Sequence, residues 1–450
     1  MPGPTTTETN RSLLTPLTRE SVQEAHSLIK SYIHETPVLT CDTLSDLASS
    51  SSSTDGGPAP KINLFFKCEN YQKVGAFKYR GATHALSRLS KEELARGVVT
   101  HSSGNHAQAL ALAARTRGVT AHIVMPTIST PSKIAATQGY GANVIFSGST
   151  SQEREAVVEK VMADTGAVLI PPYDHEHIIL GQGTMALELE KQVRELCKER
   201  PELDIHRHGV RSQQETSSAV NGIGHLDAVI APLGGGGMLS GVATALAPTS
   251  TLVFGAEPSF QGADDGRRSL QTKPPKRITT VSSLTIADGL RTPLSDLTFS
   301  VVSDPAKVVG VHSVSERQIV DAMRLLVERM KVWVEPSAAV GLAVALYDEE
   351  FRRGLLEREK AMRGEWEQTR AERRGKGETV DEKEEWTWDG WNIGIILSGG
   401  NTTIDAVTKI FQSVAEDASS VSNESNGDRS QSEKQAEREE GVLGMNGEKV

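Results

Sequence analysis

Short apolar runs rich in β-branched residues alternate with longer helical patterns through most of this 450-residue chain. Strands that are separated by helices pair in parallel, because each crossover helix returns the chain to the same end of the sheet. Such strands are buried on both faces, which explains why these runs are apolar throughout. The pattern therefore predicts an α/β fold. The expected strands are Val98–Thr100, His122–Met125, Val144–Phe146, Val168–Ile170, Ala228–Ala231, Leu252–Phe254 and Ile393–Leu397.

An amphipathic helix is expected ahead of these strands. Ser21 and Glu24 have the spacing of a capping box, which marks a helix start. Val22, Ala25 and Ile29 then recur at helical spacing, so one face of this helix is expected to be buried.

Several segments depart from the alternating pattern. Ser49–Pro60 is a tract of serine, glycine and proline, and Asp204–Gly224 is polar and aperiodic, so both are expected to be surface loops. Arg352–Glu385 is dense in charges of both signs, which predicts a solvated helix or loop. Ser413–Val450 has the composition of a disordered tail. The tryptophans expected to hold the charged segment against the body are Trp366, Trp386, Trp388 and Trp391.

Composition limits the class of function. A formal net charge of −10 argues against a protein that reads nucleic-acid backbones, which would show a basic face. Cys41, Cys68 and Cys197 are far apart, so neither a disulfide framework nor a zinc site is indicated, and a reducing compartment is expected. The N-terminus lacks the order of a secretory signal, and no apolar run has the length of a membrane span. We expect a cytoplasmic protein that acts on small molecules.

Four successive glycines, Gly234 to Gly237, follow one predicted strand directly and precede a helical run. Glycines at such a turn let backbone N–H groups close around an anion at the helix start, which predicts a phosphate cradle. A tight turn without a ligand is the plain alternative. A dinucleotide site is disfavoured, although Glu257 has the position of a ribose-binding acid, because Leu239 or Ser240 replaces the third glycine of that motif.

Two further polar segments follow predicted strands. His101-Ser102-Ser103-Gly104-Asn105-His106 precedes a strong helix former, so its donors suit a carboxylate or a phosphate, although simple N-capping by serine or asparagine is the alternative. Ser398-Gly399-Gly400-Asn401 follows the last strand, at the sheet edge where open α/β sheets bind ligands. A plain turn explains this second segment equally well.

Further segments give these turns a context: Glu69–Ala82, Gly181–Thr184, Thr285–Gly289 and Val334–Ser337. With them the chain, from about Leu14 to Ile410, resembles the serine/threonine dehydratase and serine racemase family of fold-type II pyridoxal-phosphate enzymes, which are tryptophan synthase beta-like. The resemblance implies two open, twisted, mostly parallel sheets flanked by helices, with the active site between two domains. The large domain would comprise residues 14–86 and 175–412, with insertions at 49–60, 204–224 and 352–390, and the small domain residues 87–174.

The resemblance also implies roles for single residues. Lys78 would bind pyridoxal 5'-phosphate covalently through its amine, and Ser103 would share in catalysis. The remaining cofactor contacts are implied for Phe77 beside the ring, Asn105 at the ring hydroxyl, Gly234, Gly235, Gly236 and Gly237 with Met238 at the phosphate, and Ser398 at the pyridine nitrogen. The loop that receives the substrate carboxylate contains Ser102, Ser103 and His106.

The implied residues narrow the reaction. A neutral hydroxyl such as Ser398 cannot hold a proton on the pyridine nitrogen as a carboxylate would, so elimination and racemisation are favoured over transamination. Racemisation requires a second acid or base opposite Lys78, because one lysine can return the proton only to the face it came from. Ser103 would fill this role. Threonine dehydratases of the family usually have alanine there, whereas related 3-hydroxyaspartate ammonia-lyases share the serine.

These considerations predict a serine racemase that also dehydrates serine to pyruvate and ammonia. The alternatives are a threo-3-hydroxyaspartate ammonia-lyase, a threonine dehydratase without a regulatory domain, and a catalytically silent scaffold that binds the cofactor. The presence of Lys78, Ser103 and Ser398 argues against the silent scaffold. The family also suggests a homodimer, with an amino acid as the substrate and neither nucleic acid nor membrane as a partner.

A divalent cation is implied as well. Mg²⁺ or Ca²⁺ would be bound by Glu257, Asp265 and the carbonyl of Ala263, since hard cations prefer oxygen ligands. One inserted residue makes Asp264 or Gly262 alternative ligands, and a solvated acidic loop without metal is the plain alternative. ATP activation stays open, because Cys41 and Asp42 replace serines of the nucleotide-binding members. The pairs His175/His177 and His206/His208 are interpreted as ordinary loop histidines.

Overall fold

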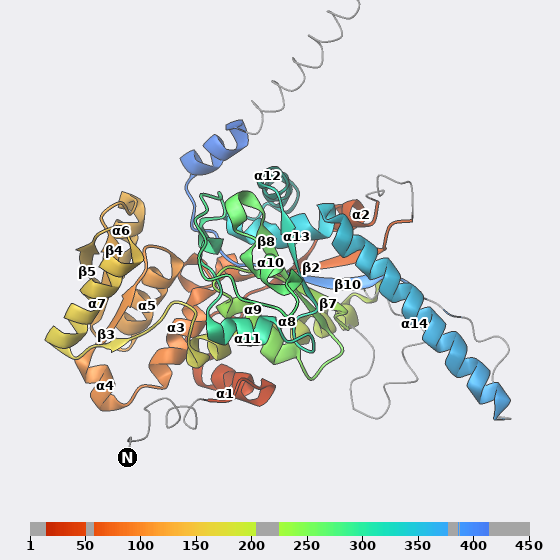
Figure 1. The fold of residues 1–450 in the computed structure, drawn as a ribbon, viewed down its shortest axis with the longest axis horizontal. Helices are drawn as coiled ribbons and strands as arrows, with labels where there is room; N and C mark the ends of the chain where they lie inside the picture. Colours follow the sequence, from red (N-terminus) through yellow and green to blue (C-terminus); the bar gives the residue numbers. More distant parts are fainter. Residues whose placement is uncertain (1–14, 51–57, 204–224, 377–385, 387, 414–450) are drawn as a thin grey trace, which may run out of the picture. The chain divides into compact units, whose positions relative to one another are not determined.

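The computed structural model describes residues 15–50, 58–203, 225–376, 386 and 388–413 (Figure 1). Residues 1–401 form one compact unit and residues 402–450 a second. The described part of the second unit is helical at 404–413. The predicted loop at 204–224, with His206 and His208, and the predicted tail after Ser413 lie outside the described residues.

A six-stranded sheet forms the centre of the first unit, in the order β1-β2-β10-β7-β8-β9. Only β1 is antiparallel to its neighbour. β10 and β7 are buried along their whole length, as expected for inner parallel strands with helices on both faces. The strands are β1 (Val38–Thr40), β2 (Ile62–Cys68), β7 (Ala228–Pro232), β8 (Leu252–Pro258), β9 (Gly310–Val314) and β10 (Trp391–Leu397).

A second, four-stranded sheet has the order β5-β4-β3-β6, and all its pairs are parallel. With α5, α6 and α7 it lies to one side of the larger sheet (Figure 1). Its strands are β3 (Val98–His101), β4 (Ala121–Pro126), β5 (Asn143–Ser147) and β6 (Val168–Leu169). Every predicted strand overlaps an observed one, and the predicted α/β fold with two mostly parallel sheets is confirmed. The predicted domain boundaries stay a prediction.

The helices fill the connections between strands. Among the described residues, none combines the length and apolarity needed to cross a bilayer. The helices are α1 (Arg19–Ile29), α2 (Asp42–Ser50), α3 (Lys78–Ser87), α4 (Lys91–Arg96), α5 (Asn105–Thr116), α6 (Pro131–Gly139), α7 (Ser151–Thr165), α8 (Glu176–Glu199), α9 (Gly237–Leu246), α10 (Asp265–Gln271), α11 (Asp296–Val302), α12 (Glu316–Leu325), α13 (Pro336–Tyr347) and α14 (Glu349–Gly375).

The first helix begins earlier than its sequence predicted. Thr18, not Ser21, is the N-cap of α1, and its hydroxyl accepts a hydrogen bond from the Ser21 N–H. The proposed capping box with Glu24 is therefore wrong, because Thr18 offers an equally good cap one turn earlier. The predicted buried face is correct, since Val22, Ala25 and Ile29 are fully buried.

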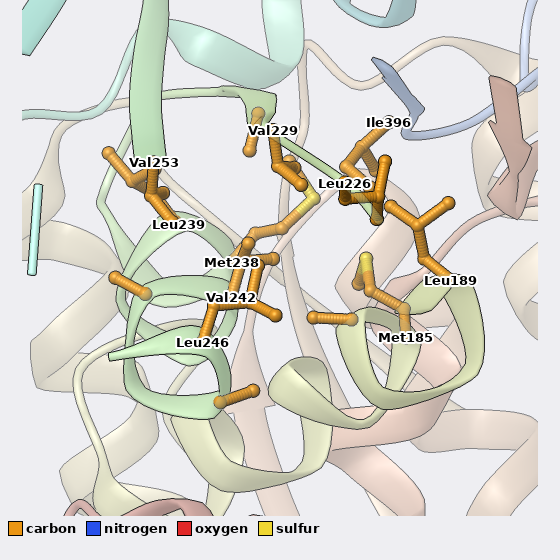
Figure 2. Packing of buried hydrophobic residues seen from close by; sticks show 14 of the residues in the cluster. Met185, Leu189, Leu226, Val229, Met238, Leu239, Val242, Leu246, Val253 and Ile396 are labelled. Atoms are coloured by element: carbon orange, nitrogen blue, oxygen red, sulfur yellow. The ribbon is translucent and has the colours of Figure 1, made fainter. Parts of the chain in front are cut away.

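The largest core cluster lies where α8 and α9 pack on the six-stranded sheet. Figure 2 shows Leu239 of α9 beside Val253 of β8, and Met185 and Leu189 of α8 on the side of Ile396 of β10. The helices approach closely because glycines line the contact. A Cβ on Gly183 would lie 2.6 Å from the carbonyl oxygen of Gly241, and one on Gly181 would lie 2.7 Å from the Cα of Gly81. This packing fixes α3 and α9, the two helices that begin at the predicted cofactor site.

The charged segment forms α14, which extends away from the sheets (Figure 1). Only its first turns are buried: Phe351 packs edge-on against Phe254, and Arg352 donates to the carbonyl oxygens of Ala48 and Ala345. The prediction of a solvated element thus holds for most of the helix. The predicted tryptophan contacts also form, as a row of neighbouring rings from Trp366 through Trp386 and Trp388 to Trp391.

Candidate active site

Two segments far apart in sequence form one end of the site. The Phe77 N–H donates to the carbonyl oxygen of Ser398 at 3.0 Å, and the Gly400 N–H donates to Gly75 at 2.9 Å. Gly75 has a φ of 71°, and a Cβ there would lie 2.8 Å from Oδ1 of Asn401. This pairing brings the start of α3 to the carboxyl end of β10, and Ser398 is itself buried.

Lys78 is the first residue of α3. Its Nζ donates to the carbonyl oxygen of Pro172 at 2.8 Å and lies 5.1 Å from the centre of the Phe77 ring. Burial lowers the pKa of Lys78 to about 8, because the charged ammonium loses its hydration. Near neutral pH the unprotonated fraction of this amine is therefore far larger than that of an ordinary lysine, which suits a nucleophile or a base.

One lysine, one arginine and two glutamates form a buried ion network that includes Arg80 of α3. Arg80 makes two hydrogen bonds to the carboxylate of Glu69 and two to that of Glu188, all between 2.7 and 2.8 Å. Lys67 donates to Glu188 at 2.7 Å and to the carbonyl oxygen of Thr36. None of these charged side chains is more than slightly exposed. The network ties α3 to β2 and α8, and the sequence interpretation did not foresee it.

The glycine run lies between β7 and α9, as expected. Gly236 has a φ of 88° and is the N-cap of α9. A Cβ would lie 2.9 Å from the Cα of Leu290 if placed on Gly234, and 2.7 Å from the Tyr173 ring if placed on Gly235. The first N–H groups of a helix have no partner within it, so this glycine-lined turn fits an anion such as phosphate.

Met238 contributes to this turn only through its backbone. Its side chain is buried in the core cluster between Val229 and Val242 (Figure 2). The side chain anchors α9, and any contact of this residue with an anion would be made by its N–H.

The serine loop precedes α5. The N-cap of this helix is Gly104, which makes no side-chain cap, so the alternative of simple capping by serine or asparagine is wrong. Ser102 instead accepts from the Gly104 N–H at 3.3 Å, and Ser102 and Ser103 are both partly exposed. The uncapped N–H groups of the first turn are therefore available to a carboxylate.

His106 differs from the other loop residues because its side chain is buried. Its Nε2–H donates to the carbonyl oxygen of Ile170 at 3.2 Å. Burial, with a smaller contribution from Lys78, lowers the pKa of His106 to about 3, so the imidazole is neutral. Only the backbone N–H of His106 is placed to face a ligand in the loop.

Asn105 belongs to a polar cluster that the sequence interpretation did not foresee. Its Nδ2 donates to Oε1 of Glu335 at 2.8 Å, and its Oδ1 accepts from Nδ2 of Asn401 at 2.8 Å. Burial, with a contribution from Asp288, raises the pKa of Glu335 to about 7. The cluster holds the Asn105 amide in one orientation. Glu335 lies in Val334–Ser337, one of the segments on which the family resemblance rests, but its hydrogen-bond partners are visible only in the folded structure.

The predicted cation ligands are close together and buried. Glu257 accepts from the N–H groups of Gly266 at 3.0 Å and Arg267 at 2.9 Å. Burial, and then the nearby Asp265, raise the pKa of Glu257 well above its ordinary value, and burial raises the pKa of Asp265 to about 6. Two buried carboxyls with raised pKa values, one of them raised in part by the other, fit a bound cation. Asp264, the alternative ligand, is instead paired with Arg268 at 2.9 Å.

Both the sequence and the fold of this chain are similar to those of known proteins. The model of the pyridoxal-phosphate dependent enzyme family matches residues 29–362. A serine racemase of Arabidopsis thaliana is 40% identical over 395 residues, which cover 87% of this chain and 96% of that protein. An L-threo-3-hydroxyaspartate ammonia-lyase of Saccharomyces cerevisiae is 40% identical over 332 residues, or 73% of this chain and 87% of that one. The structure of maize serine racemase matches with a TM-score of 0.65 at 37% identity, covering 89% of this chain and 98% of that chain.

Proposed function

Because the chain belongs to the family of pyridoxal-phosphate-dependent enzymes, we propose that it racemises serine and also dehydrates it to pyruvate and ammonia. The family predicted from the sequence is confirmed. The observation that carries the proposal is the backbone pairing that brings Ser398 to the start of α3, together with Ser103 at the uncapped start of α5. Relatives at 40% identity include a serine racemase, which supports the proposal.

The described residues fit the cofactor. A glycine turn whose positions leave no room for a Cβ precedes α9, and Lys78 presents an amine whose pKa burial lowers to about 8. In this proposal Lys78 holds the cofactor, Gly234 to Gly237 bind its phosphate, Asn105 donates to its ring hydroxyl, and Ser398 faces its pyridine nitrogen. When bound, the cofactor withdraws electrons from the Cα of the amino acid.

The chain's own groups would then move the protons. The N-terminus of α5 holds the substrate carboxylate, which fixes the Cα–H bond relative to Lys78. Lys78 removes or returns the Cα proton on one face, and the Ser103 hydroxyl serves the other face. Removal of the Cα proton together with loss of the β-hydroxyl, which leaves as water after taking up a proton, would give dehydration instead, so both products are expected from one site.

Product analysis tests the proposal. The purified protein, supplied with pyridoxal phosphate, is incubated with L-serine, and D-serine and pyruvate are measured. Formation of both is expected, and the absence of both would reject the function. Borohydride reduction followed by peptide mass analysis should locate the cofactor on Lys78, and a Lys78→Ala variant, which should remain colourless, is the control.

Ser103→Ala separates the two activities. We expect D-serine formation to fall by roughly 10²- to 10⁴-fold, the usual contribution of one general acid or base, while pyruvate formation largely persists. The physical reason is that dehydration needs a proton transfer on one face only. An equal loss of both activities would refute the role of Ser103.

A second candidate reaction is ammonia release from threo-3-hydroxyaspartate. The yeast relative with that activity is also 40% identical, and the serine at position 103 is compatible with both reactions. Comparing kcat/KM for L-serine, L-threonine and threo-3-hydroxyaspartate distinguishes racemase, threonine dehydratase and ammonia-lyase. Failure to turn over any of them would favour the silent scaffold.

Three finer proposals accompany the main one. Glu257, Asp265 and the Ala263 carbonyl would bind Mg²⁺ or Ca²⁺, supported by the two buried carboxyls whose pKa values are raised. The homodimer would appear as twice the monomer mass in sedimentation equilibrium. The cytoplasmic location would be checked by fractionation of the source cells.

A further inference from the structure

Three consecutive side chains converge at the start of α8, outside the site described above. One ligand atom from each of His175, Glu176 and His177 lies within 4.8 Å of the other two. Among the described residues, no other set of three histidine, cysteine or acidic side chains meets this condition, and the Glu257 loop does not. The convergence is unusual because neighbours on a helix normally point in different directions.

The helix start explains the geometry. His175 is the N-cap of α8 and has an extended backbone, so its side chain folds back over the first turn and its Nδ1 accepts from the His177 N–H at 3.2 Å. The same Nδ1 lies 3.6 Å from Oε2 of Glu176. The rings of His175 and His177 have their centres 5.1 Å apart. Two imidazoles and one carboxylate thus face a common point.

His177 carries an unsatisfied group. Its Nδ1 is buried and has no hydrogen-bond partner among the residues that the structure describes, whereas most buried side-chain nitrogens have one. His84 of α3 restrains this residue from outside, because its Nδ1–H donates to the His177 carbonyl oxygen at 2.7 Å and its ring stands edge-on to that of His177 at 5.5 Å.

We propose that His175, Glu176 and His177 form a binding site for a divalent transition metal ion of the Zn²⁺ class. Imidazole nitrogens select Zn²⁺, Ni²⁺ or Cu²⁺ over Mg²⁺ and Ca²⁺, which prefer oxygen ligands alone. Ligand atoms about 2.0 to 2.1 Å from one tetrahedral ion lie roughly 3.4 Å apart. The 3.6 Å separation of His175 and Glu176 is close to that value, and the ligand atom of His177 lies within 4.8 Å of both.

Two features oppose binding, and both are offset. The helix start carries roughly half a positive charge, but the full negative charge of Glu176 lies beside it. Ligation through Nδ1 of His175 displaces the bond from the His177 N–H. That N–H belongs to the first turn of α8, where donors have no partner within the helix in any case. Neither feature therefore prevents a metal ion from binding.

The site also follows closely on Pro172, whose carbonyl oxygen is contacted by the catalytic Lys78. Pro172 precedes His175 by one short turn, and Asp174 between them accepts from the Ser295 hydroxyl at 2.6 Å. A metal ion here would restrain the segment that contacts Lys78. The proposal itself depends on the three ligands and not on the reaction that the enzyme catalyses.

Calorimetric titration with Zn²⁺ tests the site. The full-length holoenzyme, without an affinity tag and with Mg²⁺ in excess, is expected to bind one Zn²⁺ per chain at this site. His177→Ala should weaken this binding by at least roughly 10- to 100-fold, the range seen when even an outer partner of a metal ligand is lost. Glu176→Gln keeps the side-chain shape and should also weaken binding. The matched control is the double variant His206→Ala/His208→Ala, which removes the chain's other closely spaced histidine pair.

Unchanged affinity in both His177→Ala and Glu176→Gln would overturn the proposal, as would loss of binding in the His206/His208 control alone. Displacement of Zn²⁺ by excess Mg²⁺ would also overturn it, because an oxygen site such as that of Glu257 would then be responsible.

Co²⁺ substitution provides an independent check: visible bands of a tetrahedral nitrogen and oxygen site support the assignment, whereas a thiolate charge-transfer band would assign the metal to a cysteine. Cofactor absorbance and far-UV circular dichroism confirm that each variant is folded.

Discussion

Replacing Arg80 by methionine should destabilise the protein far more than an ordinary arginine substitution. Arg80 is fully buried and makes two hydrogen bonds to each of two buried carboxylates, those of Glu69 and Glu188. Methionine has a similar length and no charge. The variant therefore keeps the packing volume of the side chain but leaves two negative charges with Lys67 as their remaining close cation.

The expected size follows from the position of these charges. Breaking a buried ion pair by removing one partner costs about 3–5 kcal/mol, because the remaining charge is left uncompensated away from water. Arg88 provides the matched control. It pairs with Glu24 at 2.9 Å, but both side chains are at least one third exposed. A pair of that kind contributes about 0–1 kcal/mol, so Arg88→Met should change the free energy of unfolding several times less.

The pH dependence gives a second signature. Burial alone would raise the pKa of Glu188, but Arg80, His26 and Lys67 together lower it well below its ordinary value. The stability that Glu188 contributes is therefore present above the unfolded carboxyl pKa of about 4.3 and is lost as the pH falls through the folded value. In Arg80→Met the main cause of the depression is gone. The difference in stability between wild type and variant should be largest near pH 7 and should narrow below about pH 4.

Urea unfolding followed by far-UV circular dichroism, at pH 7 and at about pH 3, measures these differences for both variants. The reasoning would fail if Arg80→Met and Arg88→Met cost the same free energy of unfolding at pH 7. It would also fail if the cost of Arg80→Met grew as the pH was lowered.

Three other predictions follow from the site. The rate at which pyridoxal phosphate attaches to the cofactor-free protein should rise as the pH rises through about 8 and then level off, because the Lys78 amine reacts only when unprotonated. The rate is measured by absorbance, and a rate independent of pH between 6 and 9 would contradict this prediction. Gly235→Ala should weaken cofactor binding, because the added Cβ overpacks against the Tyr173 ring at a cost of about 1–3 kcal/mol. Gly364→Ala, whose Cβ meets open space, should leave binding unchanged. Equal cofactor dissociation constants for the two variants would refute the phosphate site at Gly234 to Gly237. A chelator should lower the melting temperature, and Ca²⁺ or Mg²⁺ should restore it. At a metal concentration one hundred times Kd, binding to the native state adds about 2.7 kcal/mol to the free energy of unfolding, and an unchanged melting curve would remove the metal assignment.

The inner strands could be predicted from sequence, and the missed strands show where the pattern fails. β1 and β9 lie at the edges of the large sheet and are only partly buried, so they lack a continuous apolar run. β2 is an inner strand, but it contains Lys67 as a fully buried residue. The charge of Lys67 is neutralised by Glu188, which is 121 positions away. A local pattern cannot show such a partner.

The residues of the candidate site also fall into those that the sequence could indicate and those that it could not. Lys78 and the glycine run could be singled out from the sequence because each has a recognisable chemical signature, and their roles stay predictions. The groups that were missed act through the backbone or through burial: the carbonyl of Pro172 that binds Lys78, and the Glu335 carboxyl that holds Asn105. A carbonyl has no sequence signature, and the burial of a glutamate depends on neighbours supplied by the whole fold.

The order of strands in the large sheet has a consequence for how the protein is made. Among the described residues β10 is the last strand in sequence, yet it lies between β2 and β7 near the middle of the sheet. Until the ribosome has released residues 391–397, β2 and β7 each present an apolar edge with no neighbour on that side. The nascent chain must be protected from aggregation through most of its synthesis. Any truncation before β10 removes both the central strand and the segment that Phe77 binds.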